Sequence, residues 1–378
     1  MGRDPVPSVS ELFDFDDFPE LNLPEDGLYL IVQLRNELLR LPFFLKHYRS
    51  IGVQHFLIID NASTDGTSAF LEAQSDVTRF ASSKAFKDCK ALWPRALLNR
   101  YCMGHWVFLV DADEQFVYPG WPDVPFQHVL KFWADQKVEG VHAPLVDMYS
   151  DRPLREVEYQ SETPFLDTCP FFDTTSTWVL FYEGSRLAPP FEIRGGVRGR
   201  LFGRPSKKKV GWLHDEIRHF CLKPSRAWSG LAFQRWAQRK LHGYIPREIP
   251  VLNKVPLLYW RPEYTENRGV HWVDSHTKLA DDWGALLHFK FFQDFQERVE
   301  EEMERKQYYA EGHEYKTYFD GMQTILTSSP CYAGSRRFNT AADLHKAGLV
   351  RHTKELDAHL RRFQSEAAKL PLTFRATA

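Results

Sequence analysis

The sequence is short of cysteine, of net charge and of long apolar runs. Five cysteines are spread over 378 residues without a CxxC pair, so the sequence predicts neither a disulfide framework nor a zinc site. Lysine and arginine number 48 against 50 acids, a formal charge of −2, and this balance gives no reason to expect nucleic-acid binding. Because no run of about 18 apolar residues occurs, we expect no membrane-spanning helix.

A secretory signal is also missing from the pattern. The first 26 residues are acidic and contain no apolar core of a signal peptide. With cysteines that have no evident partners, this favours a cytoplasmic protein, and peripheral association with the inner face of a membrane is compatible with it. Apolar residues make up 43% of the chain, which is enough to build a sizeable core without disulfides.

Strand and helix patterns alternate over the first 120 residues. Residues 28–34 and 55–60 are apolar runs typical of strands covered on both faces, and residues 106–113 repeat the pattern. Helical patterns lie between them, at residues 42–51 and 92–101. Such alternation predicts an α/β fold of the Rossmann-like kind, with a mixed, mostly parallel sheet and helices on both faces.

The later part of the chain is less regular. Helices are predicted at residues 294–309, where apolar residues recur four apart, and after Thr340, which with Asp343 resembles a capping box. The last predicted helix carries Leu349, Leu356 and Leu360. We expect an N-terminal extension (1–26), one main domain (27–310, with a nucleotide-binding half at 27–120 and an acceptor side at 121–310) and a helical C-terminal extension (311–378).

An Asp-x-Asp tripeptide directly follows the apolar run WVFLV. In an extended chain, residues i and i+2 point the same way, so Asp111 and Asp113 can converge on one ion. Mg²⁺ and Mn²⁺ bind carboxylates and commonly share them with substrate phosphates. A tripeptide of this kind in isolation is more often a solvated turn. Here, however, a polar loop also follows the earlier strand at 55–60, as expected for a nucleotide-binding crevice at one sheet edge.

At this point the sequence resembles the family 2 type glycosyltransferases of the GT-A fold, in particular a subgroup with an early Arg-Asn-Glu and a late His-Phe-Lys-Phe. The matching segments occur in the same order as in that family and span about residues 27–310. They are Arg35-Asn36-Glu37, residues 41–44, residues 59–67, Trp106 to Glu114, residues 195–200, and residues 287–291.

The resemblance implies roles for the acids that follow the strands. It makes Asp60 and Asp65 the contacts to the base and ribose of the nucleoside, Asp111 a ligand of ribose and metal, and Asp113 a metal ligand. Many relatives have a second acid where this chain has Asn61, a departure that bears on uridine preference.

It also implies roles for basic and polar residues elsewhere. His288 is expected as a third metal ligand, although a histidine among apolar neighbours is as often a core residue. Lys290 is expected to neutralise the diphosphate, and Arg198 and Arg200, if they alternate along a strand, to bind phosphate oxygens. A glycine-rich hairpin with two solvated arginines is the alternative for that pair. The remaining nucleotide contacts expected from the resemblance are Arg35, Asn36, Glu37 and Asn61.

The implied activity is transfer of a sugar, with inversion, from a nucleoside-diphosphate sugar, expected to be a UDP-sugar, to a glycan, lipid or protein hydroxyl. The cofactor would be Mn²⁺ or Mg²⁺. For the general base, residue types favour His271 or Asp215, each beside aromatic residues. Other candidates are Glu192, His214, Glu216 and Asp274. A nucleotidyltransferase and a non-catalytic carbohydrate-binding scaffold on the same fold remain alternatives.

Overall fold

The computed structural model describes residues 7–181, 186–226, 231–247, 249–261, 266–267, 271–305 and 313–369. Its main sheet has six strands in the order β3-β2-β1-β4-β12-β6. The first four of these strands along the chain run parallel, and β12 is antiparallel to both of its neighbours. The bounds are β1 (Leu28–Leu34), β2 (His55–Asp60), β3 (Val77–Ala81), β4 (Trp106–Leu109), β6 (Gly140–Val141) and β12 (Leu257–Tyr259). The predicted α/β class is therefore confirmed.

Both faces of the main sheet are covered by apolar side chains. From β1, Leu30 packs in one core cluster with Phe44 of α2, whereas Ile31 packs in the other with Leu97 of α5. This is why the β1 run is continuously apolar. The helices before residue 170 are α1 (Val9–Leu12), α2 (Leu41–Ser50), α3 (Thr67–Glu72), α4 (Phe86–Cys89), α5 (Leu92–Tyr101), α6 (Phe126–Asp135), the 3-10 turn η1 (Leu154–Glu156) and α7 (Phe165–Thr168).

A second sheet carries the late histidine. Strand β15 (Ala285–His288) lies between β5 (Glu114–Val117), to which it is antiparallel, and β7 (Leu145–Asp147), to which it is parallel. His288 is thereby opposite Glu114 on one side and Asp147 on the other. Because β5 directly follows the Asp-x-Asp segment, this sheet brings residue 288 beside residues 111–113.

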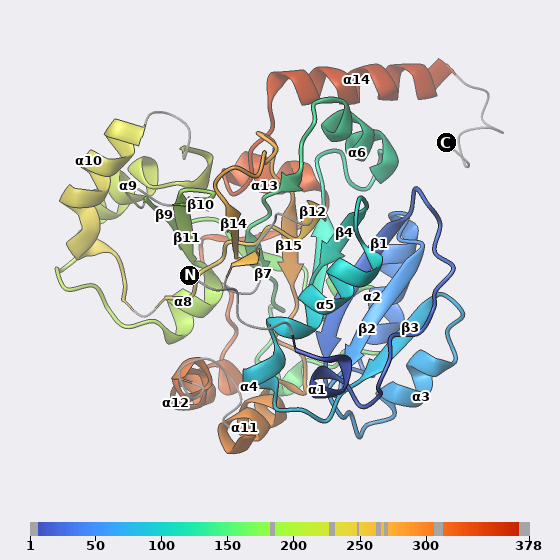
Figure 1. The fold of residues 1–378 in the computed structure, drawn as a ribbon. Coiled ribbons are helices and arrows are strands. Elements are labelled where there is room, and N and C mark those ends of the chain that lie inside the picture. The colour runs from blue at the N-terminus through green and yellow to red at the C-terminus, as the bar shows by residue number, and fades with distance from the viewer. Residues whose placement is uncertain are drawn as a thin grey trace.

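Small sheets and helices extend the molecule beyond the two central sheets (Figure 1). The strands are β8 (Phe171–Asp173) with β16 (Ser335–Arg337), β9 (Thr177–Phe181) with β11 (Phe191–Gly195), and β10 (Leu187–Ala188) with β14 (Trp272–Asp274) and β13 (Glu266–Asn267). The helices are α8 (Gly196–Phe202), α9 (Trp212–Cys221), η2 (Pro224–Arg226), α10 (Leu231–Leu241), η3 (His242–Tyr244), α11 (Phe295–Arg305), α12 (His313–Thr327), α13 (Ala341–Ala347) and α14 (Lys354–Lys369).

The C-terminal prediction needs one correction. The capping box of Thr340 and Asp343 is present and begins α13, but the single predicted helix is two helices. Gly348 ends α13 in the left-handed conformation, at φ 74°, which glycine adopts without steric cost. Leu356 and Leu360 therefore belong to α14, and both pack on the main core. Of the helix predicted at 294–309, residues 306–309 lie outside the described residues.

None of the described helices combines the length and the apolar character needed to cross a bilayer.

Candidate functional site

The Asp-x-Asp segment forms a turn, which corrects the prediction of an extended chain. Strand β4 ends at Leu109 and β5 begins at Glu114. Between them the backbone N–H of Glu114 donates to the carbonyl of Asp111 at 3.0 Å. In a turn of this kind, residues i and i+2 need not point the same way. The carboxylates of Asp111 and Asp113 accordingly have different partners.

Asp111 is paired with a lysine from a distant segment. Lys254 Nζ lies 2.9 Å from Asp111 Oδ2 and 3.0 Å from Glu114 Oε1. Burial would lower the pKa of the Lys254 ammonium, but the two carboxylates outweigh it and raise this pKa. The Asp111 side chain is 52% exposed, whereas that of Glu114 is 1% exposed. Lys254 thus anchors Asp111 while part of its carboxylate stays accessible.

Asp113 is paired instead with His288. His288 Nε2 lies 3.3 Å from Asp113 Oδ2, and its Nδ1 lies 2.6 Å from Asp147 Oδ1. Burial opposes charge on both partners, yet their mutual attraction holds the pKa of the Asp113 carboxyl well below its usual range and raises the pKa of His288. Asp147 Oδ1 also accepts from Arg198 Nε at 2.8 Å. His288 is therefore held between Asp113 and a second buried acid, Asp147.

The donors around Asp113 and His288 suit a divalent cation. In a neutral His288 the Nδ1–H donates to Asp147, so the lone pair of Nε2 faces an Asp113 oxygen. Two acceptors that face each other in this way repel unless a proton or a metal ion lies between them. Histidines that bind metals are commonly oriented by a carboxylate in this way. Among the described residues, no group of three or more His, Cys, Asp or Glu side chains is placed to hold a metal. The fit therefore rests on two side chains, not on the three that were predicted.

The loops after β1 and β2 brace one another. Asn36 Oδ1 accepts from the backbone N–H of Thr64 at 2.8 Å, and Arg35 Nη1 donates to the carbonyl of Asn61 at 3.0 Å. Asn36 and Ala62 both have positive φ angles, 53° and 55°, which is uncommon for residues with a side chain. The hydrogen bonds between the loops hold this conformation and define one wall of a cavity.

The acids predicted to contact the nucleoside, Asp60 and Asp65, accept hydrogen bonds from the same loops. Asp60 accepts from Ser63 N, at 3.0 Å, and from the Ser68 hydroxyl, at 2.6 Å. Asp65 accepts from the backbone N–H groups of Leu38 and Thr67, both at 3.0 Å. Neither acid is among the lining residues of the cavity described below.

The segment with Arg198 and Arg200 is the helix α8, so the expected strand alternation, and its hairpin alternative, are both corrected. Gly195 and Gly196 enter the helix with φ angles of 117° and 71°, which are accessible to glycine but not to most residues. Arg198 is buried against Asp147. Arg200 bonds Asp173 at 2.8 Å. The two arginines therefore stabilise the protein behind the site and do not line the cavity.

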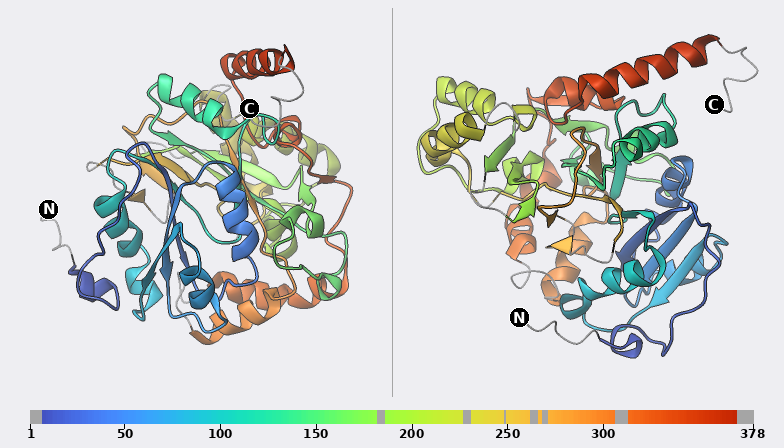
Figure 2. Two further views of the ribbon diagram at one scale, coloured as in Figure 1. Left: turned by 90° about the vertical axis from the view of Figure 1, so that its right-hand side faces the viewer. Right: turned by 45° about the horizontal axis from the view of Figure 1, so that its top comes forward.

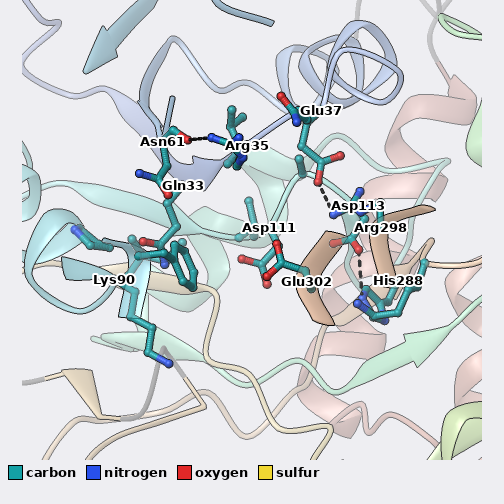
Figure 3. A pocket seen from close by; sticks show the side chains of 18 of the residues that line it. Gln33, Arg35, Glu37, Asn61, Lys90, Asp111, Asp113, His288, Arg298 and Glu302 are labelled. Carbon is teal, nitrogen blue, oxygen red and sulfur yellow. Dashed lines mark hydrogen bonds and ion pairs between the residues drawn. The ribbon is translucent and has the colours of Figure 1, made fainter. Parts of the chain in front are cut away.

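A cavity of about 290 Å³ lies at the carboxyl ends of β1 and β4. Figure 3 shows Gln33, Asn61 and Lys90 on one side of Asp111, and Asp113, His288 and Arg298 on the other. The cavity is lined by nine of the predicted site residues, which are Arg35, Asn36, Glu37, Asn61, Asp111, Asp113, His271, His288 and Lys290. Asp215 lies elsewhere, on α9, where it pairs with Arg218 and His219.

Several residues that line the cavity were not predicted from the sequence. Six cationic and five acidic side chains line it, and helix α11 contributes four of them. Arg298 Nη2 of α11 lies 2.6 Å from Glu37 Oε1. The charged lining residues that sequence analysis missed are Lys90, Lys254, Arg298, Glu301, Glu302 and Arg305, and the uncharged ones include Gln33, Phe86 and Tyr315. The helix was predicted from its apolar period, which says nothing about what its polar face contacts.

His271 lines the cavity in a defined tautomer. Its Nδ1 lies 2.6 Å from the carbonyl of Asn253, and only an N–H can bond there, so a neutral ring keeps its acceptor at Nε2. Burial, and then the charge of Lys254, lower the pKa of His271 to about 4. His271 is therefore a neutral hydrogen-bond acceptor at pH 7.

Comparison with known proteins adds little. No protein-family model matches the chain, and no curated protein matches it. Among solved structures it is similar to a CMP:2-keto-3-deoxy-manno-octonic acid synthetase complexed with CTP, with 9% sequence identity and a TM-score of 0.23. The match covers 44% of this chain and 64% of that chain, less than two thirds of its length. A likeness this weak says nothing about activity.

Proposed function

We propose that this protein is a glycosyltransferase that uses a nucleoside-diphosphate sugar. The observation that carries the proposal is that Asp111, Asp113, His288 and Lys290 line one cavity with the two loops that follow β1 and β2. Ligands of α/β sheets bind at the carboxyl ends of the strands, and cationic side chains together with a carboxylate-bound divalent cation can hold a diphosphate there. The sequence resemblance supports the same activity.

The donor would lie along the cavity with its two ends distinguished by charge. The nucleoside would lie beside Gln33 and Asn61. Gln33 Oε1 is buried and has no hydrogen-bond partner among the described residues, so it can accept an N–H from a base. The exposed part of the Asp111 carboxylate can accept a ribose hydroxyl. The diphosphate would then lie at the end that Asp113, His288 and Lys290 share.

Asp113 and His288 would hold a divalent cation, with the remaining ligands supplied by the diphosphate and water. When bound, this ion would stabilise the negative charge that develops on the leaving diphosphate. The protein supplies further stabilisation of the same charge. Against the effect of burial, Lys290 and Arg298 both lower the pKa of Asp113 and so lie near this end of the cavity, and Arg305 of α11 also lines the cavity. Preorganised positive groups of this kind lower the barrier to departure of the nucleoside diphosphate.

We propose His271 as the group that takes the proton of the acceptor hydroxyl. Its acceptor at Nε2 and its place in the cavity favour it over Asp215, which is not among the residues that line the cavity. A pKa of about 4 makes it a weak base in the empty site. A bound diphosphate would add negative charge to the cavity and raise this proton affinity.

The decisive experiment follows the products of a donor screen. Purified protein would be incubated with UDP-, GDP- and CMP-sugars and Mn²⁺, and released nucleotide would be quantified with and without simple acceptors. We expect release of a nucleoside diphosphate, which Asp113→Ala abolishes while the circular dichroism spectrum stays unchanged. Pyrophosphate release from a nucleoside triphosphate and a sugar would show a nucleotidyltransferase instead. Binding of a glycan without any turnover would show a carbohydrate-binding scaffold.

A further inference from the structure

Helices α9 and α10 form one margin of the molecule. Figure 1 shows them at the left edge, far from the parallel sheet, and both helices stay at the edge in the right-hand view of Figure 2. Their inner sides pack in a small core of their own, which contains Trp178, Cys221, Leu222 and Ala237. The two helices therefore have an ordered inner face, and the outer face is available for another contact.

Large apolar side chains are exposed on both helices of this pair. Trp212 is 80% exposed, and Phe220 is 58% exposed. Leu213, Ile217 and Phe220 recur at the i, i+4, i+7 spacing that places side chains on one face of a helix. We define the α9–α10 surface by the exposed apolar residues of this segment, which are Val210, Trp212, Leu213, Ile217, Phe220, Phe233 and Trp236. These are seven of the ten large apolar residues exposed in the described part of the chain, and such clustering marks an interaction site.

The same segment is strongly basic, although the chain as a whole is not. Residues 204–247 contain eleven lysines and arginines against two acids, and the rest of the chain contains 37 against 48. Lys207, Lys208 and Lys209 are exposed directly before α9, and Arg239 and Lys240 are exposed near the end of α10. Of the two acids, Asp215 is paired with Arg218. The segment that carries the surface therefore combines exposed aromatic residues with a formal charge of +9, eleven cations less two acids, in a protein of charge −2.

We propose that the α9–α10 surface binds the anionic surface of a phospholipid bilayer. Helices that lie in the membrane interface have Trp, Phe and Leu on one face and Lys and Arg around it. Anionic lipids attract such basic residues within about a Debye length. Tryptophan suits this boundary because its ring is apolar while its N–H can reach water.

The charge distribution argues against the other occupants of this surface. In a symmetric dimer built on this face, two segments of about +9 each would meet, which Coulomb repulsion disfavours. A single-stranded nucleic acid would use the lysines and the aromatic rings, but it has no use for exposed aliphatic side chains such as Leu213 and Ile217. A bilayer satisfies the charge and the aliphatic face together. The proposal does not depend on sugar transfer.

Vesicle flotation of the full chain tests it directly. The protein would be mixed with vesicles of pure phosphatidylcholine, or of phosphatidylcholine with 30% phosphatidylglycerol, at about 0.1 M salt. We expect flotation only with the anionic vesicles. The variant Trp212→Ser/Phe220→Ser removes two exposed rings, and Lys207→Glu/Lys209→Glu reverses two exposed charges. Each should lower the vesicle-bound fraction by about tenfold or more.

Matched controls separate this surface from general stickiness. Phe319→Ser changes an exposed ring on α12, and Lys131→Glu/Lys346→Glu reverses two exposed lysines elsewhere, so both variants should float like the wild type. The proposal is overturned by absence of flotation with anionic vesicles, or by equal loss in the control variants. A third outcome also overturns the proposal. If the wild type binds single-stranded RNA as well as vesicles, if the charge variant binds neither, and if the ring variant still floats normally, the surface is a general polyanion site.

Discussion

Lys254 Nζ lies 2.9 Å from Asp111 Oδ2, joining the tip of β4 to a residue 143 positions later in the chain. The same ammonium contacts the buried Glu114. One lysine therefore orients the first acid of the Asp-x-Asp segment and compensates a charge beneath it. This arrangement leaves Asp113 and His288 as the pair that we propose to hold the metal.

Removing this lysine is expected to destabilise the fold. Lys254→Met leaves Glu114 buried beside Asp111 without a counter-charge. Loss of one partner of a buried ion pair costs about 3–5 kcal/mol, and because burial raises the pKa of Glu114 to about 7, this carboxyl can take up a proton and keep the cost at the lower end of that range. Urea denaturation would measure the free energy of unfolding. The exposed Lys131, which pairs with Asp135, provides the control, because Lys131→Met should change stability by less than about 0.5 kcal/mol. Adding Glu114→Gln to Lys254→Met should recover part of the loss, and no recovery would contradict this account.

The two acids of the Asp-x-Asp segment are expected to differ in their effect on metal binding. Asp113→Asn removes a carboxylate beside His288 and should weaken Mn²⁺ binding at least about tenfold, or about 1.4 kcal/mol. Asp111→Asn should change Mn²⁺ affinity much less and should weaken nucleoside binding instead. Titration calorimetry with Mn²⁺ alone, and then with the nucleotide alone, separates these effects. Equal losses of Mn²⁺ affinity would mean that the two carboxylates converge on one ion after all.

His271 predicts an unusual pH profile. A histidine must be neutral to accept a proton, so activity is lost as pH falls through its pKa, which is about 4 in the empty site. With Mn²⁺ kept saturating at every pH, so that protonation of His288 does not displace the ion, the ratio kcat/KM, which reports the free enzyme, should therefore stay level between pH 7 and 5.5. His271→Asn should lower kcat by about 10²- to 10⁴-fold. A decline of wild-type kcat/KM centred near pH 6.5 would be inconsistent with the buried ring.

His142 is expected to make the fold sensitive to acid. The centroids of its ring and the Trp283 ring lie 4.6 Å apart. Neither of its nitrogens has a hydrogen-bond partner among the described residues, and burial lowers its pKa to about 3. The His142 ring therefore stays neutral in the folded state, whereas in the unfolded state it gains a proton below pH 6.5. Stability is complete above that pH and is lost as pH falls toward the folded value, by about 1.4 kcal/mol per unit.

The substitution His142→Phe tests this sensitivity. It keeps the aromatic packing and removes the titrating group, so the loss of stability between pH 6.5 and 5 should be smaller by up to about 2 kcal/mol than in the wild type. Denaturation at several pH values measures the slope. His276→Phe, at a side chain that is 71% exposed, is the control and should follow the wild type. A variant His142→Phe with an unchanged slope would show that other groups carry the acid sensitivity.

The main sheet was predictable because its signal is local. Residues 28–34 and 55–60 were expected as strands buried on both faces, and β1 and β2 have those bounds. Gly195 and Gly196 were misleading for a related reason, since glycine is common both in turns and at the entry of a helix such as α8. Local pattern therefore predicted the strands and failed where one residue type suits two conformations.

The sequence by itself determined that apolar strands would alternate with helices and that acids would follow those strands, because burial and chain direction follow from the order of residues. Only the tertiary structure decided which partner each acid has. Lys254 is 143 residues from Asp111, and Asp147 is 141 residues from His288. No periodicity links such residues; they meet because β15 lies between β5 and β7, and because the chain just before β12 passes Asp111. Charge compensation in a buried site depends on distance in space, which this sequence does not express.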